Sequence, residues 1–147
     1  MTRISLLAIV GIAAVVTTSC GASKMTQCNS IAKVTKDAEA AATKFAESSK
    51  QTNDPAVAAK SLTDMSTKSQ EFGKVIQALE IKDEKLTGFQ SRFVAMYQDY
   101  NKLFAQMSAA TQAKDAQASN KAIGEIQAAS AKEDVLVKEL TAYCTGK

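Results

Sequence analysis

Apolar side chains recur at alternating steps of three and four residues from Asp83 to Gln112. The members of this stripe are Leu86, Phe89, Phe93, Met96, Tyr100, Leu103, Met107 and Ala110, and Tyr97 and Phe104 widen it on one side. Such spacing puts them all on one face of a helix that packs against other helices. We therefore interpret these aromatic and methionine side chains as core, not as a cofactor site.

Two more helices are predicted before this segment. The first covers 30–50, and Asn29 or Ser30 can cap its start. The second begins at Asp54, a good N-cap, with Pro55 in the first turn, where its missing N–H costs little, and it runs to Leu79. Their apolar stripes are Ile31, Val34, Ala38, Ala41 and Phe45 in the first, and Ala58, Leu62, Met65, Ser69, Phe72, Ile76 and Leu79 in the second.

The remaining turns lack Gly and Pro, so the phase of the stripes places them. Continuing the second helix would carry Asp83 and Gln90 onto its apolar face, which favours a turn at 81–83. Asp115 can cap a fourth helix from Ala116 to about Tyr143, with a sparser stripe. A chain of 147 residues with one Pro and six Gly suits one helical domain. We predict an all-α, antiparallel up-down-up-down four-helix bundle over 28–147.

The N-terminus reads as an export signal over 1–19. Arg3 precedes an apolar run at 4–16, which is shorter than the roughly 20 residues a transmembrane helix needs. Small residues then lead into Cys20, an arrangement that resembles the lipobox of bacterial lipoproteins and implies that Cys20 carries the lipid. On this interpretation residues 20–27 form a lipid-anchored tether, and the alternative is a soluble secreted form.

Export into an oxidising compartment makes Cys28 and Cys144 candidates for a disulfide. Following the chain from Cys28 through turns centred near 52, 81.5 and 114 returns it to about the level of residue 141, roughly 4.5 Å from Cys144 along the axis. The first and last helices of such a bundle are neighbours, so we predict a bond between them. Cys20 then stays unpaired, as lipidation requires.

The side chains of most enzyme sites are missing. The chain has no His, no Cys cluster with zinc spacing, and no Gly-rich phosphate loop. Sixteen Lys against two Arg, spread among the acidic residues, also argue against nucleic-acid recognition. We predict a non-enzyme without metal or cofactor. Glu133 interrupts the fourth stripe; it either turns to solvent or pairs near the core with Arg92, within a turn of it.

With the signal, GFQSRFVAMY at 88–97 and KELTAYC at 138–144, the chain resembles small cyanobacterial lipoproteins of unknown function. The resemblance implies a helical bundle on the periplasmic or thylakoid-lumenal side of a membrane. The layout is also similar, at the level of architecture alone, to the lipid-anchored four-helix subunits of photosystem II.

Three functions fit these observations. The first is a membrane-tethered, non-catalytic accessory or assembly module that binds an unidentified protein of an envelope or photosynthetic complex. The second is a carrier of small molecules or lipids, with Tyr97, Tyr100 and Met107 lining an interior pocket. The third is a soluble secreted structural or stress protein.

Overall fold

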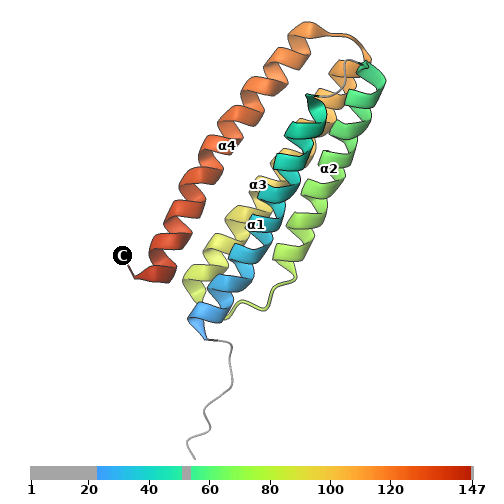
Figure 1. Ribbon diagram of the computed structural model, residues 1–147. Coiled ribbons are helices and arrows are strands. Elements are labelled where there is room, and N and C mark those ends of the chain that lie inside the picture. The colour runs from blue at the N-terminus through green and yellow to red at the C-terminus, as the bar shows by residue number, and fades with distance from the viewer. Residues whose placement is uncertain (1–22, 51–53, 147) are drawn as a thin grey trace, which may run out of the picture.

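The computed structural model describes residues 23–50 and 54–146. Four helices run alternately up and down the molecule: α1 (Lys24–Ser49), α2 (Pro55–Gln77), α3 (Glu84–Gln112) and α4 (Ala116–Thr145) (Figure 1). No strand occurs among the described residues. The predicted all-α four-helix bundle is confirmed. The expected signal peptide at 1–19 and Cys20 lie outside the described residues.

Aspartates begin three of the four helices. The carboxylate of Asp54 accepts a hydrogen bond from the amide of Ala56 (2.8 Å), and Asp115 accepts one from Ala118 (2.9 Å). Asp83 caps α3 in the same way, through the amide of Leu86 (2.9 Å). Each carboxylate satisfies an amide that the helix leaves unpaired, which stabilises the start by about 1 kcal/mol. The caps predicted at Asp54 and Asp115 are confirmed.

Helix α1 begins six residues earlier than predicted. Its N-cap is Ser23, whose hydroxyl accepts from the amide of Thr26 (3.2 Å), so the predicted caps Asn29 and Ser30 are wrong. Part of the expected tether, residues 24–27, is helical. The reason is that the buried face continues back through Cys28 to Gln27, a polar side chain that is only 5% exposed.

Helix α3 lies at the centre of the core and packs most closely on α2. The two helices are in contact at Gly73, where a side-chain Cβ would stand at van der Waals distance, 3.5 Å, from the Cβ of Tyr97. Next to this crossing, the ring of Tyr97 packs on Phe72, with centroids 5.8 Å apart. The buried apolar residues of the bundle are Cys28, Ile31, Val34, Ala38, Ala59, Leu62, Met65, Ile76, Leu86, Phe89, Phe93, Tyr97, Tyr100, Phe104, Ala110, Ala122, Leu136 and Leu140.

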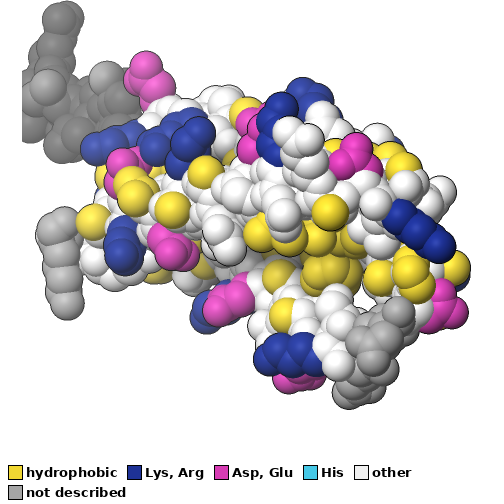
Figure 2. All heavy atoms as spheres, turned by 90° about the horizontal axis from the view of Figure 1, so that it is seen from above, with side chains coloured by type: hydrophobic (Ala, Val, Ile, Leu, Met, Phe, Trp, Pro, Cys, Tyr) yellow, Lys and Arg dark blue, Asp and Glu magenta, His cyan; other side chains and the backbone are white. Residues whose placement is uncertain are grey.

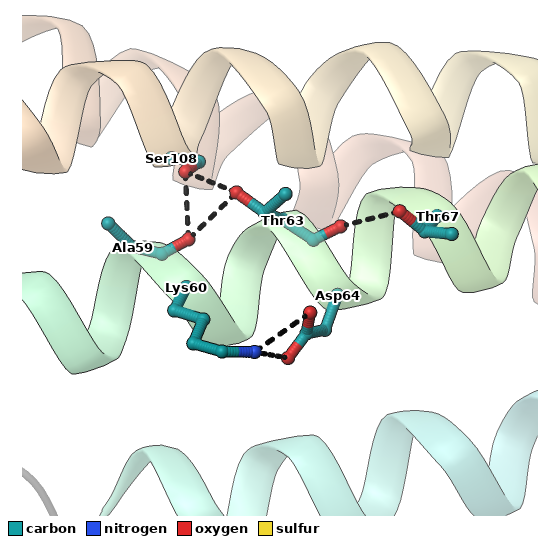
Figure 3. Close-up of polar contacts among 6 residues, drawn as sticks. All are labelled: Ala59, Lys60, Thr63, Asp64, Thr67 and Ser108. Atoms are coloured by element: carbon teal, nitrogen blue, oxygen red, sulfur yellow. Dashed lines mark hydrogen bonds and ion pairs between the residues drawn. The ribbon is translucent and has the colours of Figure 1, made fainter.

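Hydroxyl groups fix the register of α2 against α3. Ser108 of α3 donates to the carbonyl of Ala59 (2.8 Å), and its hydroxyl also bonds that of Thr63 (2.9 Å), as Figure 3 shows. These polar contacts join α2 to α3 near the start of α2. Further along, the hydroxyl of Ser66 donates to the carbonyl of Asn101 (2.8 Å), whose side chain donates back to the carbonyl of Ser66 (2.9 Å). A shift of one helix turn would break all four bonds.

Helix α4 buries fewer of its described side chains than the other three helices do. Only Ala122, Leu136 and Leu140 are buried among its described residues. It is joined to α1 at the end of the bundle where Cys28 and Cys144 lie, here called the disulfide pole, and the two helices make few other contacts. Figure 2 looks onto the molecule from above and shows hydrophobic side chains in a hollow with charged side chains around it. The fold therefore leaves apolar surface uncovered.

The predicted core on α3 is correct in part. Leu86, Phe89, Phe93 and Tyr100 are buried, as expected. Met96, Leu103 and Met107 are only partly buried, so their assignment to the core was too strong. The side chains thought merely to widen the stripe, Tyr97 and Phe104, are buried instead. Helix α3 packs mainly on α2 and next on α4, and α4 covers it less completely because it offers few large side chains.

Candidate functional site

The predicted disulfide is present. Cys28 and Cys144 are bonded, with their Cα atoms 6.0 Å apart, although 116 residues separate them in sequence. Cys28 is 2% exposed and belongs to the core. Because the bond joins the first helix to the last, it clamps the start and the end of the bundle together at the disulfide pole.

Gln27 binds a loop next to this bond. Its side-chain oxygen accepts hydrogen bonds from the backbone amides of Lys82 (2.6 Å) and Asp83 (3.0 Å) in the connection between α2 and α3. These amides come before the first turn of α3 and have no helical partner. The buried amide of Gln27 thus joins α1 to the loop at the same pole, a role that the sequence pattern did not reveal.

Tyr143 completes the disulfide pole. Its hydroxyl donates to the carboxylate of Asp83, 2.9 Å from each oxygen, and the ammonium groups of Lys24 and Lys85 lie 3.7 and 4.8 Å from its ring centroid. The pKa of Asp83 is lowered, first by the hydrogen bond from the amide of Leu86; desolvation opposes this, and the hydroxyl of Tyr143, the amide of Lys85 and the charge of Lys24 lower the pKa further. Asp83 therefore stays ionised and joins α3 to α4.

The predicted ion pair between Arg92 and Glu133 is wrong. Arg92 instead pairs with Glu139, six residues further along α4. Both side chains are about half exposed, 52% and 46%, so the pair adds at most about 1 kcal/mol. The antiparallel register was estimated from turn positions alone, and an error of a few residues is enough to exchange one acidic partner for another.

Glu133 is partly buried, and no Lys or Arg among residues 23–50 and 54–146 forms an ion pair with it. Its carboxylate accepts a hydrogen bond from the hydroxyl of Tyr100 (2.8 Å). Burial raises the pKa of Glu133; the bond from Tyr100 lowers it, and the charges of Asp134 and Glu39 raise it further. The charges acting on this carboxylate from α1 and α4 are therefore both acidic. Neither predicted position, solvent or a cation near the core, describes it.

Glu133→Gln is expected to stabilise the protein at neutral pH, by at most about 1 kcal/mol because solvent screens a partly exposed charge. A raised pKa in the folded state means that the contribution of Glu133 to stability is greatest below the ordinary pKa of glutamate. It is lost as the pH rises through the raised value. Urea titrations at several pH values should show the variant gaining on wild type as the pH rises. A variant that loses stability at neutral pH would contradict this account.

Tyr97 is a buried polar side chain on which the charge of Glu133 acts. The residue is 3% exposed, and its hydroxyl makes no hydrogen bond to the described residues. Burial raises the pKa of Tyr97, and the charge of Glu133 and the nearby Tyr100 raise it further. Two tyrosines and one carboxylate thus form a single electrostatic cluster between α3 and α4, with both phenols neutral.

An open groove runs along the outer side of α3 and α4. It encloses about 870 Å³. Its apolar lining is Ala95, Met96, Leu103, Ala128, Ala129, Ala131, Val135 and Leu136, and its charged lining is Arg92, Asp99, Lys102, Glu125 and Lys132. We call it the α3–α4 groove. The carrier hypothesis placed Tyr97, Tyr100 and Met107 around a pocket, and none of the three lines this groove.

Similarity to known proteins does not indicate which of these surfaces is functional. No family model, no curated protein and no solved structure matches this chain.

A smaller hollow lies at the end opposite the disulfide pole, here called the distal pole. It holds about 350 Å³ and is lined by Asp54, Pro55, Ala58, Thr111, Lys114, Ala116 and Ser119. The structure thus brings the end of the α1–α2 connection beside the α3–α4 turn. Lys114 has a positive φ of 53°, a left-handed conformation that costs a non-glycine residue roughly 1–2 kcal/mol.

Among residues 23–50 and 54–146, no group of three or more His, Cys, Asp or Glu side chains is placed to hold a metal ion. Within the same ranges, no helix combines the length and apolar character needed to cross a membrane.

Proposed function

We propose that this protein is a membrane-tethered, non-catalytic interaction module that binds a protein partner of an envelope or photosynthetic membrane complex. The observation that carries the proposal is the orientation of the bundle, whose disulfide pole is the end nearest to Cys20 in sequence. Helix α1 begins at Lys24, only four positions after Cys20, and the disulfide holds α4 at the same pole. A lipid on Cys20 would lie within about 14 Å of the helix start.

In this orientation the bundle is a spacer between the lipid surface and the distal pole. The 26 residues of α1 span about 39 Å at 1.5 Å per residue. The opposite end of the rod carries the α3–α4 turn and the start of α2 (Figure 1). On this proposal the distal pole is held some distance from the lipid surface, where a partner's extramembrane part can reach it.

The distal pole also has features of a contact surface. Its hollow is shallow and mixes apolar Pro55 and Ala58 with Lys114 and Ser119. Lys114 is the left-handed residue of the cap that ends α3, in which the amide of Asp115 donates to the carbonyl of Ala110 (2.9 Å), so the backbone of this turn is fixed. An open hollow of mixed polarity on a fixed turn favours protein docking over small-molecule binding.

Site-specific photocrosslinking in intact membranes tests the docking. A photoreactive amino acid at Lys114 is expected to give one discrete adduct, because Lys114 lines the hollow of the distal pole. The matched control is Lys36, an exposed lysine on α1, where we expect no adduct. Equal labelling at both positions, or none at Lys114, would contradict docking through the distal pole.

Membrane fractionation tests the tether separately. Wild-type protein is expected in the membrane pellet and Cys20→Ser in the soluble fraction, with mass spectrometry finding lipid on Cys20 of the wild type. An unmodified Cys20 in a released protein would favour the soluble secreted alternative.

A further inference from the structure

The α3–α4 groove exposes apolar side chains that the single chain does not cover. Val135 is 52% exposed, and Met96 and Leu103 are only partly buried, although both belong to the regular apolar stripe of α3. The apolar stripe of α3 therefore extends beyond the side chains that the core buries. Apolar surface gathered in one groove between two helices is typical of an interaction site.

We propose that the groove binds a second copy of this chain, related by a two-fold axis parallel to the helices. In this arrangement α3 of each copy lies over α4 of the other, and the two disulfide poles lie at the same end. The contact is isologous, so each attraction occurs twice.

Two cross-groove contacts give the relative height of the charged residues. Arg92 pairs with Glu139, and Tyr100 bonds Glu133. Asp99 and Lys132 are each the chain neighbour of one member of the second pair. They therefore lie within about 3 Å of the same level, on opposite sides of the groove.

These two residues are poorly paired within one chain. Asp99 has a loose contact with Lys102, 3.8 Å long between side chains that are about two-thirds exposed. Lys132 makes no ion pair within the described ranges. In the parallel dimer, Asp99 of each copy faces Lys132 of the other, so this charge pair occurs twice. The groove is thus complementary to itself in charge as well as apolar.

The direction of the second copy follows from the tether, and this step rests on the proposed function. Two chains anchored through Cys20 must keep their disulfide poles toward the same membrane. An axis parallel to the helices does this, whereas an axis across them would point one pole away. The charge complementarity stands without the tether.

Sedimentation velocity of the full chain in mild detergent tests the dimer. Wild type is expected to be a dimer and Val135→Asp a monomer, because the new carboxylate would be buried in the contact. Val75→Asp is the matched control, since Val75 is 49% exposed on α2, away from the groove, and this variant should remain dimeric. Circular dichroism checks that both variants are folded. A monomeric wild type, or equal disruption by both variants, would overturn the proposal.

A charge exchange tests the orientation. Asp99→Lys and Lys132→Asp are each expected to weaken the dimer about tenfold, and the double variant to restore it. Failure of the double variant to recover would overturn the parallel arrangement. Cys20→Ser separates this inference from the tether: a soluble protein that still dimerises through the groove supports the dimer even if the anchor fails. Membrane-bound wild type that is monomeric refutes the dimer alone.

Discussion

Replacing Cys28 and Cys144 together by Ala is expected to lower the free energy of unfolding by about 5 kcal/mol. The bond closes a loop of 116 residues, and the entropy that this closure removes from the unfolded chain grows with loop length. Urea denaturation of the wild type and of the double variant, followed by circular dichroism, measures the difference. Reduction of the wild type should reproduce it.

The loss should fall first on α4. Only three of its described residues are buried, and it contacts α1 little beyond the disulfide, so without the bond α4 depends on its contacts with α3. Amide exchange in the double variant should therefore rise more in α4 than in α2. The double variant Arg92→Ala/Glu139→Ala is a suitable control, because that exposed pair also joins α4 to the bundle and should cost at most about 1 kcal/mol. A disulfide variant no less stable than this control would refute the clamp.

The sequence was sufficient for the order of the helices and for the disulfide. Asp54, Pro55 and Asp115 are local signals that act in the same way in any helical protein. The disulfide needed only that four helices of known length fold back and forth. An axial error of one helix turn does not change which two cysteines meet.

The polar contacts could not be predicted in this way. Gln27 binds a loop more than fifty residues away, and Gln90 donates to the carbonyls of Ile76 (2.8 Å) and Leu79 (2.9 Å) at the end of α2. Periodicity treats such residues as solvated, because their partners are backbone groups that become available only when the chain folds. The same limit explains why Arg92 was assigned to Glu133 and not to Glu139: identifying an ion pair requires the register to within one or two residues.

The α3–α4 groove could likewise be predicted only in part. The apolar stripe on α3 identified Met96 and Leu103 as hydrophobic contacts but could not say that they face a groove and not the core. That distinction depends on α4, whose small side chains cover α3 incompletely. Pattern reveals that a face is apolar, and only packing reveals what covers it.

Phe93→Ala is expected to destabilise the protein by about 3 to 5 kcal/mol. Phe93 is fully buried on α3, and its removal costs both the transfer of a large ring from water and the cavity left behind. Because α2 and α3 share most of the core, the two helices should lose stability together and unfolding should remain one transition. Urea denaturation gives the size of the change, and its slope shows whether the transition stays cooperative.

Two further variants distinguish the effect of the apolar volume removed from the effect of burial at the site. Phe93→Leu keeps most of the apolar volume and should cost about 1 to 2 kcal/mol, whereas Val75→Ala removes apolar atoms from an exposed site on α2 and should stay within about 0.5 kcal/mol. The expected order follows from burial, since both sites are apolar and helical. If Phe93→Ala cost no more than Val75→Ala, α3 could not be the centre of the core, and the packing of the other three helices around it would have to be different.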